Sequence, residues 1–184
     1  MTEKEKMLNG ELYHAFDPQL VKEYKLAKKL MWKFNNTDPS NFKKLRKMIK
    51  KIFGKTGEVV EVRPPFYFDY GKNIEVGENF FANYDCVILD VNKVKIGKNC
   101  LLAPKVSIYT AGHPLDVRER AELLEYGYPV TIGDDCWIGG NSVINPGVTL
   151  GNNVIVASNS VVTKSFGDNL VIGGNPAKII KRLD

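Results

Sequence analysis

VTIGDDCWIGGNSVINPGVTLGNNVIVASNSVVTK, residues 130–164, repeats one pattern every six residues. An aliphatic residue recurs without a slip at each sixth position: Ile132, Ile138, Ile144, Leu150, Val156 and Val162. A period of six fits neither an α-helix, whose faces repeat every 3.6 residues, nor a lone strand, whose faces alternate. It is typical of a parallel β-helix, in which three short strands and three corners form each coil.

Glycine often follows the aliphatic residue, as at Gly133, Gly139 and Gly151. A tight corner often needs positive φ, which glycine adopts readily because it has no Cβ. We therefore expect these glycines to form the bends between strands.

The same period runs earlier in the chain, in two registers. The first contains Val76, Ala82 and Ile88, and the second contains Ile96, Leu102 and Ile108. The second register is displaced by two residues near Asn92, so one coil must carry a small insertion. Residues 110–129, TAGHPLDVRERAELLEYGYP, lack the pattern, and the period resumes in phase at Ile132. These residues are predicted to form a loop that projects from one corner.

Three segments are expected on these grounds. Residues 1–57 have helical patterning, with helices predicted at 3–9, from Asp17-Pro18 to about 35, and at 42–53. Residues 58–172 are predicted to form the β-helix. Residues 173–184 are too few for another coil and are predicted to fold back as a cap, because repeat proteins need covered ends.

The net charge of +5 is unevenly placed, because residues 1–55 hold 14 Lys and Arg but 6 Asp and Glu. No zinc-finger spacing or RNP-type aromatic motif accompanies these charges, so we interpret them as a solvated helix face rather than a nucleic-acid site. No apolar run approaches the ~20 residues of a membrane span, and the N-terminus lacks a signal-peptide core. A cytoplasmic protein without a membrane partner is expected.

The three cysteines, Cys86, Cys100 and Cys136, each lie four residues after an aliphatic position of the repeat. They therefore occupy one repeated core position. We interpret them as packing residues rather than a disulfide or metal set, and no metal is expected.

Several segments together resemble the maltose and galactoside O-acetyltransferases, and the maltose branch most. They include MLNGELYHAFDPQL, NFFANYDCVILDV, IYTAGHPLD and VIGGNPAKIIK. The resemblance covers nearly the whole chain. It implies an all-β solenoid, specifically a left-handed parallel β-helix with an N-terminal helical segment. It also implies a homotrimer that binds acetyl-CoA and transfers the acetyl group to a sugar hydroxyl.

His113 is the predicted catalytic base. It begins the projecting loop, between Gly112 and Pro114, and matches the family's GHP. An alcohol does not lose its proton at pH 7, whereas a neutral imidazole can accept it as the oxygen attacks a thioester. Direct transfer without an acyl-enzyme is expected. Glu125, at the far end of the loop, is either the carboxylate that orients this base or an exposed loop charge. His14 is expected to be structural.

The resemblance also implies residues that bind the two substrates. The acceptor set is Asp17, Asp69, Asn83 and Asp90. Carboxylates and amides pair well with hydroxyls. Asp17 is equally a helix N-cap, and the corner positions of Asn83 and Asp90 admit a structural role.

The set implied for acetyl-CoA is larger: Trp137, Gly140, Ser158, Thr163, Lys164, Lys178 and Lys181. Lysines near the ends of the coils suit phosphate groups, and a glycine admits a close-lying pantetheine arm. Trp137 either contacts the donor or packs at a coil edge.

Other functions fit less well. A γ-class carbonic anhydrase needs three histidine zinc ligands, and this chain has two histidines. A purely structural β-helix would lack the loop. A xenobiotic acetyltransferase of the streptogramin or chloramphenicol type shares the scaffold, the histidine and the donor, and remains the alternative. The N-terminal helical segment favours the sugar branch.

Overall fold

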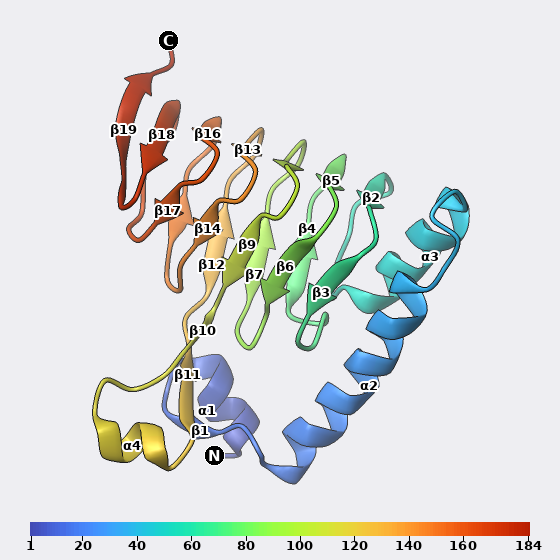
Figure 1. The fold of residues 1–184 in the computed structure, drawn as a ribbon, viewed down its shortest axis with the longest axis vertical. Coiled ribbons are helices and arrows are strands. Elements are labelled where there is room, and N and C mark those ends of the chain that lie inside the picture. Colours follow the sequence, from blue (N-terminus) through green and yellow to red (C-terminus); the bar gives the residue numbers. More distant parts are fainter.

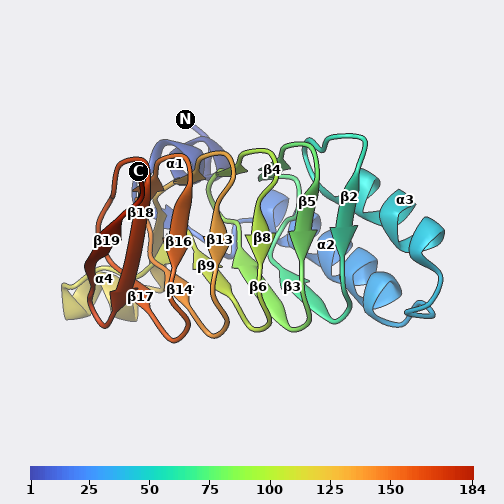
Figure 2. The ribbon, with the colours of Figure 1, turned by 90° about the horizontal axis from the view of Figure 1, so that it is seen from above.

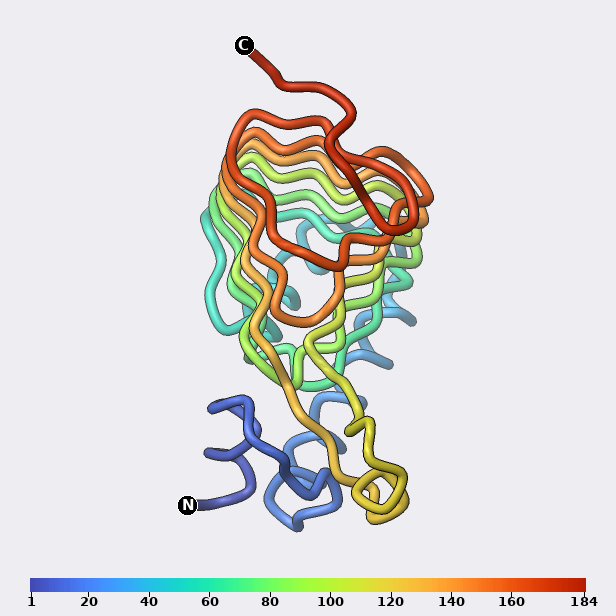
Figure 3. The backbone as a smooth tube through the Cα atoms, turned by 90° about the vertical axis from the view of Figure 1, so that its left-hand side faces the viewer, coloured from blue at the N-terminus to red at the C-terminus, as the bar shows by residue number.

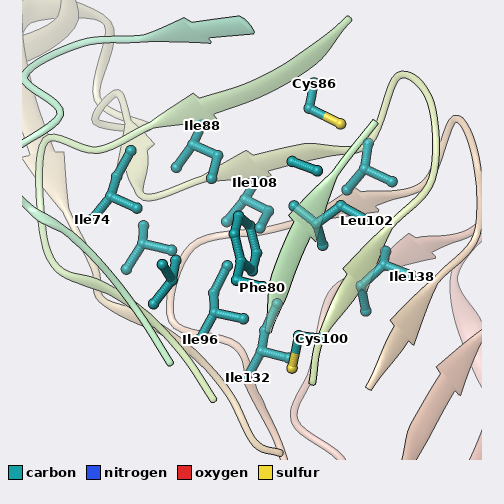
Figure 4. Close-up of a cluster of buried hydrophobic side chains, with 14 of the residues drawn as sticks. Ile74, Phe80, Cys86, Ile88, Ile96, Cys100, Leu102, Ile108, Ile132 and Ile138 are labelled. Carbon is teal, nitrogen blue, oxygen red and sulfur yellow. The ribbon is translucent and has the colours of Figure 1, made fainter. Parts of the chain in front are cut away.

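The computed structural model describes residues 1–184, and three parallel sheets form the walls of its body (Figure 1). Figure 3 looks along the stack and shows the coils superposed on one another. The aliphatic positions of the repeat point inward and pack from coil to coil (Figure 4). Ile132, Ile138 and Ile144 are all fully buried. The predicted fold class, a β-helix with an N-terminal helical segment, is confirmed.

Successive coils add strands to the three walls, and the antiparallel β19 adds one more to the edge of the longest wall. The seven-stranded wall consists of β2 (Val60–Val62), β5 (Phe80–Ala82), β8 (Leu101–Leu102), β13 (Trp137–Ile138), β16 (Val154–Val156), β18 (Leu170–Gly174) and β19 (Ala177–Arg182). The five-stranded wall consists of β3 (Phe66–Phe68), β6 (Cys86–Leu89), β9 (Ser107–Tyr109), β14 (Val143–Ile144) and β17 (Val161–Val162). The four-stranded wall consists of β4 (Ile74–Val76), β7 (Val94–Ile96), β12 (Val130–Ile132) and β15 (Thr149–Leu150).

The glycines of the repeat are required for a different reason from the one predicted. Gly133, Gly139 and Gly151 do not have positive φ; the left-handed positions are Asn or Asp two residues later, such as Asp135 and Asn141. A Cβ on Gly133 would lie 2.6 Å from the backbone of Gly151 in the next coil. Coil-to-coil approach, rather than the bend itself, therefore excludes a side chain at these positions.

The prediction that the three cysteines are packing residues of the core is confirmed. Cys86, Cys100 and Cys136 are all buried in the core, and none is in a disulfide. Burial raises the pKa of the Cys86 thiol to about 11.

The corner between the five-stranded and four-stranded walls, called here the five–four corner, interrupts the repeat in three successive coils. Val76 pairs with Ile96, 20 residues on, whereas Ile132 pairs with Leu150, 18 residues on. The predicted insertion lies at this corner, in residues 90–93. A comparable one in residues 69–73, not foreseen, precedes it, and the loop of residues 110–129 follows in the next coil.

The loop projects as predicted but has structure of its own. It contains β10 (Ala111–Gly112), α4 (Val117–Ala121) and β11 (Leu124–Gly127). β11 pairs antiparallel with β10 on one side and with β1 (Tyr13–His14) on the other. The N-terminal segment and the loop thus share a small sheet below the coils (Figures 1 and 3).

The N-terminal helices have the predicted bounds within a residue or two: α1 (Glu3–Asn9), α2 (Pro18–Asn35) and α3 (Phe42–Ile52). α2 and α3 lie at the β2 end of the stack (Figure 2), where α3 packs against β2. None of the helices has the length and apolar character to cross a membrane.

The C-terminal segment folds back as predicted, although it runs along the seven-stranded wall and does not cover the end of the stack. β19 runs antiparallel to β18 and forms the edge of the seven-stranded wall, with every residue from Lys178 to Arg182 exposed.

Candidate functional site

A pocket of about 660 Å³ lies at the five–four corner, between the N-terminal segment, the coils and the loop. Ten of its 15 lining residues are hydrophobic, including the aromatic Tyr13, Phe16, Tyr24, Tyr70 and Tyr109. Its polar side chains include Asp69, Glu125 and His113, three of the predicted site residues. The structure therefore brings together residues from three distant parts of the sequence.

His113 is placed on the loop immediately after β10. Its Nδ1 lies 3.3 Å from the carbonyl oxygen of Leu124 in β11. When Nδ1 carries the hydrogen, it donates to that carbonyl, and Nε2 keeps the lone pair that a base requires. Gly112 is needed here because a Cβ would overlap the Tyr126 ring across the hairpin. This contact with the Leu124 carbonyl was not predicted from the sequence.

Glu125 faces the same pocket and accepts a hydrogen bond of 2.7 Å from the Tyr13 hydroxyl. Tyr13 is 1% exposed, so the bond is shielded. Burial raises the pKa of the Tyr13 phenol well above its usual range, and the Glu125 carboxylate adds to the rise. This hydrogen bond fixes the carboxylate in the pocket wall. The role of Glu125 in orienting His113 stays a prediction.

Asp69 is the second carboxylate of the pocket, and it contacts Lys28 of α2 at 3.3 Å. Burial raises the pKa of the Asp69 carboxyl, although the Lys28 ammonium acts in the opposite direction. Lys28 also donates to the carbonyl of Phe68 at 2.5 Å. From the sequence, Lys28 was interpreted as part of a solvated helix face. Its contact with Asp69 was not predicted, because the two residues are 41 positions apart.

Asp90 lies beneath the pocket rather than in its lining. Its carboxylate accepts from the backbone N–H groups of Asp69, Tyr70 and Asn73 at 2.9–3.3 Å and is fully buried. Burial raises its pKa to about 7, although these N–H donors act in the opposite direction. Asp90 thus holds the insertion that presents Asp69 and Tyr70.

The other two predicted acceptor residues do not line the pocket. Asp17 is the N-cap of α2 and accepts from the N–H groups of Gln19 and Leu20 at 2.9 and 3.3 Å. Asn83 follows β5, at the corner between the seven-stranded and five-stranded walls, called here the seven–five corner. Its Oδ1 accepts from the N–H of Tyr84 at 2.9 Å.

The predicted acetyl-CoA residues divide among three places. Gly140 and Ser158 lie at the seven–five corner, in neighbouring coils. Trp137, 51% exposed, and the exposed Lys178 and Lys181 belong to the seven-stranded wall. Thr163 and Lys164 follow β17 at the five–four corner and are exposed. In one chain the predicted acetyl-CoA residues are therefore divided between one wall and two corners.

The aromatic lining of the pocket was not predicted from the sequence. Tyr13, Phe16 and Tyr24 come from the N-terminal segment, where the only signal is their position around Asp17. Nothing in the hexapeptide pattern marks Tyr70 or Tyr109 as site residues. The structure contains no group of three or more His, Cys, Asp or Glu side chains that could hold a metal ion.

Comparison with known proteins gives consistent matches over both parts of the chain. Residues 6–57 match the family model described as the maltose acetyltransferase hexapeptide capping motif, and residues 129–164 match that of the hexapeptide repeat of succinyl-transferase. The chain is 40% identical to the galactoside O-acetyltransferase of Escherichia coli (strain K12), over 98% of this chain and 92% of that protein.

Solved structures agree. A maltose O-acetyltransferase from Clostridium difficile 630 superposes with a TM-score of 0.99 at 51% identity, covering 100% of this chain and 98% of that one. A galactoside acetyltransferase in complex with coenzyme A gives a TM-score of 0.97 at 39% identity, covering 100% and 92%.

Proposed function

Since the chain belongs to the family of maltose and galactoside O-acetyltransferases, we propose that it acetylates a hydroxyl of a sugar or glycoside. The protein is an acyltransferase with acetyl-CoA as its donor. The observation that carries the sugar assignment is the meeting of His113, Asp69 and Glu125 in one aromatic-walled pocket. Carboxylates pair with hydroxyl groups, and aromatic faces pack against the apolar face of a sugar ring.

In this proposal His113 is the general base. Its Nε2 takes the proton from the acceptor hydroxyl as that oxygen forms a bond to the thioester carbonyl carbon. The carbon–sulfur bond then breaks, and the imidazolium returns the proton to the departing thiolate, so that CoA leaves as a thiol. Such base assistance contributes ~10²–10⁴-fold to the rate. The Leu124 carbonyl supports this role because it favours the tautomer with a free Nε2.

The donor side is proposed to follow the seven-stranded wall. Exposed Trp137, Lys178 and Lys181 lie on this wall, and Gly140 and Ser158 lie at the corner beside it. An extended thiol arm and nucleotide phosphates suit an exposed strip that ends in lysines.

We also propose a homotrimer in which each site is shared. Asn83, Gly140 and Ser158 lie at the seven–five corner, whereas His113, Asp69 and Glu125 lie at the five–four corner. A threefold axis beside the five-stranded wall would bring one corner of each copy next to the other corner of its neighbour. Asp17 would border the acceptor from the start of α2.

The activity test is a thiol-release assay with acetyl-CoA and a panel of glucosides, galactosides, maltose and drug alcohols. Turnover with glucosides or maltose supports the sugar assignment. Turnover confined to streptogramin- or chloramphenicol-like alcohols would replace it with the xenobiotic alternative.

The shared site is tested by mixing two inactive variants, His113→Ala and Asn83→Ala, unfolding and reassembling them together. A shared site in a random trimer restores roughly a quarter of wild-type activity, because one site in four then combines an intact half from each copy. No recovery, from mixed oligomers verified by mass, would contradict the shared site.

A further inference from the structure

Asn92 lies in the insertion at the five–four corner and is 2% exposed. Its Nδ2 donates to the carbonyl oxygens of Met7 and Leu8, each at 3.2 Å, and to that of Gly127 at 2.7 Å. Its Oδ1 accepts from the N–H of Lys93 at 2.7 Å. An amide has two N–H hydrogens, so one serves Gly127 and the other is shared between Met7 and Leu8.

These acceptors belong to the two segments that enclose the pocket together with the coils. Met7 and Leu8 are in the last turn of α1, from which the chain continues to Tyr13 in β1. Gly127 ends β11, the strand that carries Glu125 and the Leu124 carbonyl facing His113. One side chain of the coil therefore fixes the N-terminal segment and the loop relative to each other. Figure 3 shows the backbone of these two segments below the coils.

The residues around Asn92 also hold the N-terminal segment and the loop against the coils. Val91 is 5% exposed and packs in a small cluster with Met7, Tyr13 and Leu20. A Cβ on Gly127 would lie 2.8 Å from Val91 Cγ2, so the loop strand passes directly over the insertion. Thr110 Oγ1 accepts from the N–H of Asn92 at 3.0 Å and donates to the carbonyl of Leu89 at 2.7 Å.

We infer that Asn92 is a positioning residue of the acceptor pocket: its buried amide sets how the N-terminal segment, which carries Tyr13, docks on the loop that carries Glu125 and His113. The two extra residues of this coil then serve to dock the catalytic loop against the N-terminal segment. The kinetic consequence of the inference rests on the proposed function, whereas its structural consequence does not.

The chain offers a matched control in Asn35. Its Nδ2 donates to the carbonyl of Phe66 at 3.0 Å, and its Oδ1 accepts from the N–H of Phe66 at 2.9 Å. Like Asn92, it joins the N-terminal helices to a coil through a side-chain amide. Unlike Asn92, it does not bind the loop or any segment that holds Glu125 or His113.

The kinetic test compares Asn92→Ala, the isosteric Asn92→Asp, which replaces the donor, and Asn35→Ala, with maltose as acceptor. We expect both Asn92 variants to raise the KM for maltose about tenfold, which corresponds to ~1.4 kcal/mol of lost positioning. The KM for acetyl-CoA should change less than twofold. Asn35→Ala should lower the melting temperature without changing either KM. Equal effects on both substrates, or no effect of Asn92→Ala, would overturn the inference.

Hydrogen exchange supplies a readout that needs no acceptor. In Asn92→Ala we expect at least tenfold faster exchange in residues 7–14 and 122–129, with residues 94–109 unchanged. Unchanged exchange in both segments would overturn the inference. A wild-type protein that acetylates none of the sugars or glycosides in the panel would count against the proposed function alone, because the exchange experiment still decides the role of Asn92.

Discussion

The stacked coils and the five–four corner follow opposite rules. In the coils every strand repeats its neighbour, and glycines such as Gly133 let adjacent coils touch. At the five–four corner three successive coils depart from the repeat, and the pocket with His113 lies there. A regular wall offers the same surface at each level, so it forms a scaffold but no unique cavity. The pocket lies where additional residues interrupt the repeat.

The largest expected effect separates the two regions most sharply. His113→Ala should lower acetyl transfer at least tenfold, and up to ~10⁴-fold, because the acceptor loses its base. Binding of acetyl-CoA, measured by calorimetry, should change little, since His113 is not among the residues proposed to bind the donor. The matched control is His14→Ala: this exposed histidine does not line the pocket. Unchanged turnover in His113→Ala would remove the base assignment.

A substitution in the coils should have the opposite effect: it should lower stability and leave turnover unchanged. Gly133→Ala places a Cβ 2.6 Å from the backbone of Gly151 and should reduce the free energy of unfolding by about 1–3 kcal/mol. Turnover per folded molecule should be retained. Gly167→Ala is the control, because no atom lies within 4 Å of its added Cβ. Denaturant titration measures both, and equal stability of the two variants would contradict contact between coils as the reason for glycine.

The buried Asp90 links the corner to pH. Its pKa in the folded protein, about 7, lies above the ordinary aspartate value of 3.8. The folded state then binds more protons between these values, so stability falls as pH rises through about 7. Relative to Asp90→Asn, the wild type should lose on the order of 4 kcal/mol between pH 4 and pH 8. Denaturant titrations at several pH values measure the free energy of unfolding of both proteins. If the difference between them stays constant from pH 4 to pH 8, the raised pKa of Asp90 is refuted.

The smallest expected effect tests the contact within the corner. Tyr13→Phe removes the hydrogen bond to Glu125 and should reduce the free energy of unfolding by about 1–2 kcal/mol. The KM for the sugar acceptor should rise a few-fold, with that for acetyl-CoA unchanged. Tyr67→Phe is a suitable control, because this tyrosine is 42% exposed on the five-stranded wall. Identical kinetics in both variants would show that the Tyr13 contact does not shape the pocket.

The body of the fold was predictable because its constraints are local and repeated. The six-residue period fixed the inward positions from Ile132 to Val162, and the family resemblance is confirmed by relatives over the full length. The role of the repeat glycines was predicted incorrectly, since the contact that excludes a Cβ lies 18 residues away and leaves no mark in a single coil.

The site was predictable only in part. His113 and Asp69 were identified through the resemblance, and the structure places both in one pocket. The sequence carried no signal of the Leu124 carbonyl, the Lys28 contact or the Asn92 amide, because each contact depends on a backbone atom or a single side chain that no sequence pattern marks. The functions of the substrate-binding residues stay predictions.

The 18-residue spacing of the later coils has one further consequence. Coils beyond the loop contact only their immediate neighbours, as Thr131 with Thr149 and Val143 with Val161. A whole turn of chain inserted or excised there would lengthen or shorten the molecule while leaving the pocket geometry intact. The height of the solenoid is thus an independent variable, open to evolution and to design.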